Sequence, residues 1–405
     1  MKKIVQKFGG TSLDNENKRL SAARKVKDAM NSGFFPVVVV SAMGRLGNPY
    51  STDTLIQLAE KIFIDIPARE KDLLMSCGEI ISTVVMVQTL KKIGIDSLAL
   101  TGAQAGIITD NRFGRSAVKS VDSAYLLNIL NQGKVPIVAG FQGITKSGEI
   151  TTLGRGGSDT TASVIAAAIN ALFIEIYTDV EGVMTADPLI VNEAQILEEV
   201  SYNEACELAY QGAGVIHPRA AEIAMNEKIP IKIKSTFENN NGTLIHNYGL
   251  RDISGDRPVT GIASRNNILF IKVYPDEPAE YATGLRVFKL LSNHDISVDF
   301  INIRPRAISF IVDDKCLQNV SEILKEYNFN YDLSEEYVKV SVVGGGMTGQ
   351  PGIMARIVEA LSAKDIAIFQ TTDSHTTISC LVKKEKEKDA VKILHRAFGL
   401  NKIKF

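Results

Sequence analysis

Two glycine-rich turns hold the residues of this chain that could handle a phosphate. The first is Lys7-Phe8-Gly9-Gly10-Thr11-Ser12, and the second is Gly154-Arg155-Gly156-Gly157-Ser158-Asp159-Thr160-Thr161. Each follows a strand-like or turn-rich run and opens a helix-like one. Adjacent glycines let a ligand approach the backbone, and the first N–H groups of a helix are unpaired donors at its positive end. The pattern therefore favours a site that holds nucleotide phosphates during phosphoryl transfer.

Charged side chains lie in both turns. Lys7 adds a positive charge to the first turn, whereas the second offers Arg155 to an anion and Asp159 to a cation or a lysine. A Gly-Gly connection between a strand and a helix is common, so neither turn decides the chemistry alone. For Asp159 the alternative is a helix N-cap, a position that suits this residue type. His217, which precedes Pro218 at an expected helix start, is interpreted as a structural histidine.

The bulk composition restricts the classes of function. The 405 residues allow two to three domains, and 45 Lys and Arg against 46 Asp and Glu leave a net charge of −1. No overall charge therefore points to nucleic acid or a membrane as a partner. The most apolar runs are shorter than the roughly 18 residues of a spanning helix, and the N-terminus lacks a signal peptide's apolar core. With four scattered cysteines and no metal-binding Cys or His spacing, we expect a cytoplasmic protein without a protein-held metal.

The first 235 or so residues alternate short β-branched runs with longer amphipathic stretches, such as Leu20–Met30. Continuous Val and Ile runs separated by helices predict a mostly parallel sheet that helices cover on both faces. Ligands of such sheets bind beyond the carboxyl ends of the strands, where both glycine turns fall. The predicted strands are Lys3–Lys7, Pro36–Ser41, Ser97–Thr101, Val135–Phe141, Phe173–Thr178 and Ile231–Lys234.

The C-terminal part contains an internal repeat with identical residues 70 positions apart, for example Asp295 and Asp365 or Ile296 and Ile366. Each copy predicts strand, helix, strand, strand and helix, which is the ferredoxin-like βαββαβ order once a final strand is supplied. A polar, glycine-containing stretch at 238–258 precedes the repeat and marks a domain boundary. The predicted divisions are a first domain at 1–245, a linker at 246–267, and the two copies at 268–336 and 337–405.

One motif points to a different cofactor. Residues Gly344–Gly349 fit G-x-G-x-x-G after the strand-like run Val338–Val343, with Asp373 further on, which is a pattern of dinucleotide-binding loops. Pro351-Gly352 interrupts the helix that should follow, and the other copy of the repeat lacks the glycines. We therefore disfavour a dinucleotide and assign the loop to an effector site.

Together, the two glycine turns resemble the signature pair of the aspartate kinases, within the amino-acid kinase family. The resemblance covers essentially the whole chain and is strongest to the monofunctional enzymes of Gram-positive bacteria. It implies an α/β amino-acid kinase fold, a mostly parallel sheet sandwiched by helices, plus two ferredoxin-like α+β ACT domains that sense amino acids. In this family the segment around Val259–Ala263 completes the second ACT domain. Four further segments carry the resemblance: Val39–Gly44, Ser76–Glu79, Leu100–Gly106 and Thr178–Pro188.

The implied reaction is ATP + L-aspartate → ADP + 4-phospho-L-aspartate, the first step toward lysine, diaminopimelate, threonine and methionine. The nucleophile is a side-chain carboxylate with a pKa of about 3.9, so it is ionised at neutral pH and needs no general base. Catalysis then consists of positioning two anions and neutralising the transferred phosphoryl group. Lys7 is the expected source of that positive charge, and Asp159 would hold Lys7 and help to order Mg²⁺ on ATP.

The resemblance also assigns two binding subsites. Arg155 would bind the α-carboxylate of aspartate, and Glu79 would bind its α-ammonium unless it only caps the helix expected over Ile80–Leu90. Gly214 and Leu189 stand where the family usually has lysine and arginine near the nucleotide. The expected substrate-binding residues are Ser41, Thr52, Glu79, Arg155, Gly156, Gly157 and Ser158. The expected ATP-binding residues are Lys7, Phe8, Gly9, Gly10, Ser12, Thr178, Asp179, Met184, Thr185, Ala186, Asp187 and Pro188.

An end-product amino acid is expected to inhibit through the ACT pair, with lysine, meso-diaminopimelate and threonine as the candidates. The pair is also expected to form the interface of a homo-oligomer, a dimer or a tetramer. Two alternatives stay open: an amino-acid kinase that acts on glutamate, N-acetylglutamate or UMP, and a non-catalytic amino-acid sensor. The expected effector residues are Asp295, Ile296, Ser297, Asp299, Gln350, Pro351, Gly352 and Ile353.

Overall fold

The structure, a computed structural model, describes residues 1–247, 258–275, 281–347 and 349–402. The chain forms two compact units, each built from more than one segment. The first unit comprises Met1–Val183, Ile196–Ala209 and Gly214–Leu250, and the second comprises Met184–Gln195, Tyr210–Ala213 and Arg251–Phe405. Two short segments from within residues 1–245 thus belong to the second unit. The predicted domains are continuous ranges of sequence, so they do not describe this exchange. Residues 248–257 of the predicted linker lie outside the described residues.

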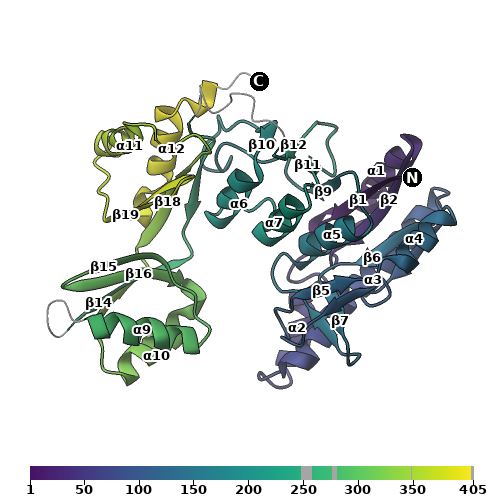
Figure 1. The fold of residues 1–405 in the computed structure, drawn as a ribbon, viewed down its shortest axis with the longest axis horizontal. Helices are drawn as coiled ribbons and strands as arrows, with labels where there is room; N and C mark the ends of the chain where they lie inside the picture. The colour runs from purple at the N-terminus through teal and green to yellow at the C-terminus, as the bar shows by residue number, and fades with distance from the viewer. Residues whose placement is uncertain (248–257, 276–280, 348, 403–405) are drawn as a thin grey trace. The chain divides into compact units, whose positions relative to one another are not determined.

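An eight-stranded sheet forms the centre of the first unit (Figure 1). Its strand order is β10-β12-β11-β9-β1-β2-β6-β3, and neighbouring strands are parallel except for β11 and β12. All six predicted strands lie in this sheet, so the prediction of a mostly parallel sheet is confirmed. The strands are β1 (Lys2–Phe8), β2 (Phe34–Val40), β3 (Ser97–Leu100), β6 (Val135–Ala139), β9 (Ile174–Thr178), β10 (Glu199–Val200), β11 (Ile231–Ser235) and β12 (Thr243–Ile245).

Helices pack on this sheet because its central strands are apolar on both faces. Val37–Val40 of β2 are fully buried, as expected for a parallel strand that is covered on two sides. Side chains of β1, β2 and β6 share one core with helices α1 and α3, whereas α5 contacts β1, β2 and β9 and packs against α7. The helices are α1 (Glu16–Asn31), α2 (Thr52–Glu60), α3 (Ala68–Lys92), α4 (Ala124–Asn131), α5 (Gly157–Ala168), α6 (Tyr202–Tyr210) and α7 (Pro218–Asn226).

Four short strands form a second sheet that sequence analysis did not predict. Its order is β5-β4-β7-β8. Strands of three or four residues are too short for an alternating pattern to stand out. Strand β8 ends two residues before Gly154 and leads into the second glycine turn. The strands are β4 (Ile107–Thr109), β5 (Val118–Val121), β7 (Gln142–Thr145) and β8 (Ile150–Thr152).

Helix α3 is long and apolar enough to cross a membrane, judged by length and composition alone. Half of its most apolar stretch is buried inside the protein, and Met86 and Leu90 belong to the core of the first unit. Core helices of water-soluble proteins pass the same test, so the helix is weak evidence for a membrane span. Sequence analysis did not single it out because Ser, Gly, Glu and Thr interrupt its apolar residues.

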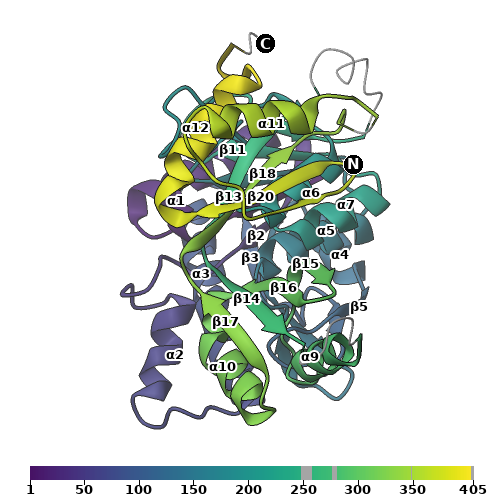
Figure 2. The same cartoon turned by 90° about the vertical axis from the view of Figure 1, so that its left-hand side faces the viewer.

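The second unit contains the two copies of the repeat as separate α/β modules (Figure 2). The first copy follows the predicted βαββαβ order, and its last strand lies at the edge of the sheet β15-β16-β14-β17. Helices α9 and α10 share one core with this sheet. The elements are β14 (Ile268–Tyr274), α9 (Tyr281–Asn293), β15 (Asp299–Arg304), β16 (Ala307–Asp313), α10 (Leu317–Glu326) and β17 (Asn330–Ser334).

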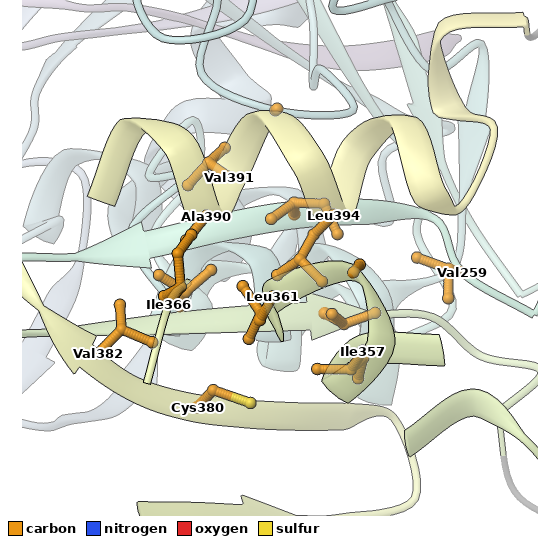
Figure 3. Close-up of a cluster of buried hydrophobic side chains, with 14 of the residues drawn as sticks. Val259, Ile357, Leu361, Ile366, Cys380, Val382, Ala390, Val391 and Leu394 are labelled. Carbon is orange, nitrogen blue, oxygen red and sulfur yellow. The ribbon is translucent and has the colours of Figure 1, made fainter. Parts of the chain in front are cut away.

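The second copy takes its last strand from an earlier part of the chain. In the sheet β13-β18-β20-β19, strand β13 (Gly261–Arg265) occupies the place that β17 has in the first copy. The expectation that the segment around Val259–Ala263 completes this module is therefore confirmed. Val259 and buried residues of α11 and α12 form one core (Figure 3). The other elements are β18 (Tyr337–Val343), α11 (Ile353–Ser362), β19 (Gln370–Asp373), β20 (Thr377–Lys383) and α12 (Glu387–Ala397).

Equivalent residues of the two copies adopt equivalent conformations. Asp295 and Asp365 have positive φ angles of 56° and 52° just after α9 and α11, and both are followed by a buried isoleucine. The glycine loop after β18 has a packing explanation. A Cβ atom on Gly344 would lie 2.1 Å from the carbonyl oxygen of Pro258, at the start of the segment that enters β13. Close backbone approach thus accounts for this glycine without a dinucleotide.

Candidate active site

The carboxyl ends of neighbouring strands meet at one edge of the large sheet. The Gly9 N–H, just after β1, donates to the Tyr177 carbonyl of β9 at 3.2 Å. The Ser41 N–H, just after β2, donates to the Phe8 carbonyl of β1 at 3.1 Å. The first glycine turn therefore lies where predicted, beyond the strand ends at which ligands of parallel sheets bind.

Gly10 is required in the first turn by a close backbone approach. A Cβ atom there would lie 2.4 Å from the carbonyl oxygen of Ala42. The turn continues into a single 3₁₀ turn, and α1 begins only at Glu16, after its N-cap Asn15. The long helix that follows the first turn therefore starts after residues 13–15, which separate it from the 3₁₀ turn.

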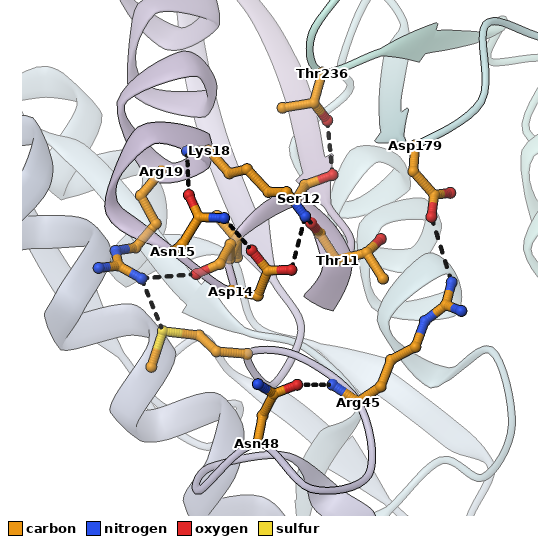
Figure 4. Close-up of polar contacts among 12 residues, drawn as sticks. Thr11, Ser12, Asp14, Asn15, Lys18, Arg19, Arg45, Asn48, Asp179 and Thr236 are labelled. Carbon is orange, nitrogen blue, oxygen red and sulfur yellow. Dashed lines mark hydrogen bonds and ion pairs between the residues drawn. The ribbon is translucent and has the colours of Figure 1, made fainter.

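Polar contacts fix the backbone around the first turn (Figure 4). The hydroxyl oxygens of Ser12 and Thr236 lie 2.7 Å apart and link the turn to the end of β11. Lys18 donates to the Thr11 carbonyl at 3.0 Å and forms an ion pair with Asp14 at 2.7 Å. The hydroxyl of Ser12, a residue predicted to bind ATP, is thus engaged with the protein itself.

The second glycine turn does open a helix. Helix α5 begins at Gly157, and Gly156 occupies the N-cap position with a φ angle of 67°, which favours glycine. A Cβ atom on Gly156 would lie 2.1 Å from the His217 ring. The Gly157 N–H donates to the Gly154 carbonyl at 2.9 Å, and no side chain caps this helix. The next amides of the helix's first turn therefore lie in the arrangement that binds anions.

Lys7 and Asp159 join the two turns. Their ammonium and carboxylate lie 2.6 Å apart, with only 13% and 12% of the two side chains exposed. The His217 backbone N–H donates to the other oxygen of Asp159 at 3.3 Å. Since Gly156 is the N-cap, Asp159 lies within the first turn of α5, and the alternative that it caps the helix is wrong. A partly accessible cation held by a carboxylate can neutralise a phosphoryl group.

His217 is closer to the site than sequence reasoning indicated. Its ring lies against Gly156, and its Nδ1 is buried without a hydrogen-bond partner in the described part of the chain. Burial lowers the pKa of His217, which keeps the ring neutral at pH 7. The sequence signal was weak because a histidine before Pro218 fits an ordinary helix start, and Pro218 does begin α7.

Glu79 is a buried carboxylate near the first turn. Its side chain is 3% exposed, and Oε1 accepts the Ala42 N–H at 3.2 Å, while Oε2 is buried without a partner among the described residues. Burial raises the pKa of Glu79 to about 8. Helix α3 begins at Ala68, so the expected helix start at Ile80 is wrong and Glu79 is not a cap. An unpaired buried carboxylate oxygen is costly and suits a cationic ligand.

The other residues expected to bind substrate come from three connections. Ser41 follows β2 directly, and Thr52 is the first residue of α2, half-buried after its N-cap Ser51. Arg155 is exposed between β8 and α5, while Ser158 is buried in the first turn of α5. The guanidinium of Arg155 is therefore accessible to a ligand.

The residues expected to bind the nucleotide are divided between the two units. Thr178 ends β9, which pairs with β1, and Asp179 follows it with its carboxylate 3.3 Å from the exposed Arg45. Met184–Pro188 belongs to the second unit. The chain therefore changes unit just beyond the strand whose end lies beside Lys7.

Within the second unit, Met184–Pro188 packs with the C-terminal module. Thr185 is fully buried, with its hydroxyl 2.9 Å from Nε2 of His395, and Ala186 belongs to the core around α11 and α12. At the two departures from the family pattern, the Leu189 side chain is 89% exposed, and a Cβ atom on Gly214 would have open space.

The expected effector residues lie in two loops of the modules and at the first residues of the elements that follow, β15 and α11. Asp299 opens β15, and its carboxylate is 2.6 Å from the ammonium of Lys339 in β18, whose side chain is 4% exposed. The Gln370 side chain of β19 donates to the Phe300 carbonyl at 2.6 Å. Gly352, with a φ angle of 93°, is the N-cap of α11. Asp299 thus holds a contact between the two modules.

Comparison with known proteins agrees with this fold. The amino acid kinase family matches residues 2–235, and the ACT domain family matches residues 332–396. Aspartokinase 1 of Bacillus subtilis is 45% identical, over 99% of this chain and 100% of the relative. A structure of E. coli aspartokinase III with aspartate and ADP has a TM-score of 0.80 at 25% identity, covering 97% of this chain and 99% of that one. A second structure of that enzyme, with lysine and aspartate, has a TM-score of 0.77 at 25% identity, covering 98% and 100%.

A parallel sheet with two glycine turns at its edge, joined to paired ferredoxin-like modules, defines an amino acid kinase with ACT domains. The full-length similarity narrows this class. The chain belongs to the aspartokinase family.

Proposed function

We propose that this protein transfers the γ-phosphoryl group of ATP to the side-chain carboxylate of L-aspartate at the edge of the large sheet. The observation that carries the proposal is Glu79. Its buried Oε2 has no partner among the described residues. Its Oε1 accepts a hydrogen bond from the Ala42 N–H, and Ala42 lies against Gly10 of the first turn. A ligand with an ammonium group satisfies this oxygen, and aspartate carries one beside the carboxylate that reacts.

Arg155 is the proposed partner of the α-carboxylate. It is exposed at the turn before α5, and a guanidinium fork matches the geometry of a carboxylate. Ser41, Thr52 and the Gly156–Ser158 backbone complete the proposed substrate site. With its two backbone charges bound, the substrate presents its side-chain carboxylate, which is ionised at neutral pH and attacks without a general base.

Lys7 is proposed to neutralise the transferred phosphoryl group. The Asp159 carboxylate at 2.6 Å orients its ammonium, and the His217 N–H fixes Asp159 in turn. Preorganised charge of this kind is a large term in phosphoryl transfer. ATP is proposed to bind along the first turn from Lys7 to Ser12 and at Thr178 and Asp179, all within the first unit.

Mg²⁺ is proposed to accompany ATP, where it would neutralise charge on the β- and γ-phosphates. In the described ranges, no group of three His, Cys, Asp or Glu side chains is arranged to hold a metal ion. Phosphate oxygens and water are proposed to supply its other ligands, with Asp159 as the nearby carboxylate.

Regulation is proposed to act through the ACT domains. The E. coli enzyme that resembles this chain has a structure with lysine and aspartate, so lysine stands beside meso-diaminopimelate and threonine as a candidate effector. The proposed site comprises residues 295–299 and 350–353. We also propose a homo-oligomer, a dimer or a tetramer formed through the ACT domains, and a cytoplasmic location.

A substrate panel tests the proposed reaction. ADP release would be measured with ATP, Mg²⁺ and each of aspartate, glutamate, N-acetylglutamate and UMP. We expect turnover with aspartate alone. Turnover with one of the others would identify a different amino acid kinase, and ligand binding without any turnover would identify a sensor.

A further inference from the structure

Asp72 is a buried acidic residue of α3 that none of the roles above includes. It is 1% exposed, yet every contact described for its carboxylate is a hydrogen bond from a neutral donor. Oδ2 accepts the N–H groups of Thr152 at 2.8 Å and Gly114 at 2.9 Å. Oδ1 accepts the Thr152 hydroxyl at 2.7 Å and lies 3.0 Å from the Gly114 nitrogen. A buried charge held only by backbone and hydroxyl donors fixes those donors in place.

Both partners of Asp72 border the turn that carries Arg155. Thr152 is the last residue of β8, three positions before Arg155. Gly114 lies against the same turn, since a Cβ atom on Gly154 would be 3.1 Å from the Gly114 carbonyl oxygen. The Asp72 carboxylate therefore grips the strand that enters the turn and the loop that packs beside it.

A second contact ties the same helix to the same strands. The Gln142 side chain of β7 donates to the Ser76 carbonyl of α3 at 3.0 Å, and Gln142 pairs with Thr152 across β7 and β8. Asp72 and Ser76 are one helical turn apart, so α3 is anchored to this small sheet at two successive turns.

Glu79 lies seven residues after Asp72 in the same helix. Seven residues make two turns, so the two carboxylates share one face of α3 about 10 Å apart along its axis. Helix α3 thus carries Glu79 and, two turns earlier, the Asp72 carboxylate that bonds to the residues bordering the Arg155 turn.

We propose that Asp72 is a positioning residue that sets the spacing between Arg155 and Glu79, and thereby matches the site to the two backbone charges of an α-amino acid. The inference rests on the proposed substrate site. Asp72 touches neither substrate nor nucleotide. It acts by fixing the position of the Arg155 turn relative to the helix that carries Glu79. Loss of this spacing lowers the affinity for aspartate.

Asp72→Asn is the sharpest change, because it keeps the shape and replaces one acceptor oxygen by an amide that repels the N–H groups. We expect the KM for aspartate to rise about tenfold or more, since small displacements of positioning groups cost this much, with the KM for ATP within about twofold. Glu175→Gln is the matched control. Glu175 is also a buried carboxylate in the first unit, but its partners are Gln6, Tyr177 and Lys234, none of them in the Arg155 turn. Its substitution should therefore leave the KM for aspartate unchanged.

Thr152 supplies milder variants in case Asp72→Asn does not fold. Thr152→Val removes the hydroxyl that donates to Asp72 and keeps the side-chain volume, so it should raise the KM for aspartate several-fold. Thr152→Ser retains the donor and should restore a KM close to that of the wild type. Equal KM values for the valine and serine variants would overturn the proposal.

Arg155→Ala separates failure of the inference from failure of the site. We expect it to raise the KM for aspartate, and the double variant with Asp72→Asn to raise it no further, because both changes act on one interaction. A wild-type KM in Arg155→Ala would overturn the proposed site. Two other results would overturn only the role of Asp72, provided that Arg155→Ala does raise the KM for aspartate. One is a wild-type KM for aspartate in Asp72→Asn, and the other is a double variant in which the two increases multiply.

Discussion

Glu79 and Asp299 are both acidic side chains that the family resemblance assigns to ligands, yet they have opposite surroundings. Glu79 is 3% exposed and has an oxygen without a partner among the described residues. Asp299 is half-exposed and already paired with the buried ammonium of Lys339 at 2.6 Å. Within the described ranges, the kinase site therefore keeps an unpaired carboxyl oxygen for its substrate, whereas in the ACT pair the carboxylate of Asp299 already has a partner within the chain.

This difference has a consequence for the two ligands. Aspartate brings the cation that Glu79 lacks, so its binding relieves a cost that the free enzyme carries. A cationic effector at Asp299 must instead compete with Lys339 for the same carboxylate. Catalysis is thus expected to depend strongly on Glu79 and Lys7, and regulation to depend more weakly on Asp299.

Lys7→Ala should have the largest effect. Loss of one preorganised charge at a transition state typically costs about 10²–10³ in rate, and we expect that loss in kcat with the fold intact. Lys2→Ala, at the exposed start of the same strand, is the control and should retain wild-type kcat. If Lys7→Ala kept more than half of the wild-type kcat, Lys7 would not be the phosphoryl-stabilising residue.

Glu79→Gln should raise the KM for aspartate and leave the KM for ATP nearly unchanged. The pH profile sharpens this expectation, because burial places the pKa of Glu79 at about 8. As the pH falls below about 8, the free enzyme protonates Glu79, and kcat/KM for aspartate should decline. The variant should lack this limb. An identical limb in wild type and variant would assign the titration to another group.

The same shift predicts an effect on stability. The pKa of Glu79 is raised in the folded protein, so its contribution to stability is present at pH below 4.5 and is lost as pH rises through about 8. Glu79→Gln should therefore become more stable relative to the wild type as pH increases from 6 to 9. Thermal unfolding of both proteins across this range measures the difference, and a constant gap in Tm would contradict it.

The strands and modules that position the two sites were predictable from the sequence, but the burial of their charged side chains was not. Continuous Val and Ile runs predicted the six strands that bring Lys7 and Ser41 to one edge, and the repeat predicted both modules. Nothing local marks Asp72 or Lys339 as buried. Asp72 lies in a charged run, Arg69–Asp72, that is typical of a solvated helix face, and its burial follows from contacts with Thr152, 80 residues away.

The sequence also did not indicate that Met184–Gln195 belongs to the second unit. Its pattern continues from β9, and the assignment to the second unit depends on Thr185 meeting His395, 210 residues further on. The short strands β4, β5, β7 and β8 were missed because three or four residues carry too little periodic signal. Long-range partners, which a single sequence does not display, decide all of these cases.

Lys339→Met tests the regulatory half of the comparison. Removing the internal cation should lower the midpoint for inhibition by the active effector several-fold, within the range of about 5–150-fold that site coupling typically spans. Asp299→Ala should shift the midpoint the other way. Inhibition curves with lysine, meso-diaminopimelate and threonine measure both, and unchanged midpoints in the two variants would remove Asp299 from the effector site.

Arg45→Ala should have the smallest effect. Arg45 pairs with Asp179 at 3.3 Å, but its side chain is 76% exposed, and exposed pairs contribute about 0–1 kcal/mol. We expect a change in the KM for ATP of less than about fivefold, since about 1 kcal/mol is a factor of about five. A tenfold rise would make this surface pair part of the nucleotide site.

The central claim, that Glu79 receives the α-ammonium of aspartate, is tested most directly with succinate, which is aspartate without that ammonium. The competitive inhibition constant for succinate and the KM for aspartate would be measured in the wild type and in Glu79→Gln. We predict that the substitution raises the KM for aspartate about tenfold or more, as for loss of a buried charged hydrogen bond, and leaves the inhibition constant for succinate unchanged or lower. Equal losses for both ligands would contradict the claim, because the penalty would then not depend on the ammonium.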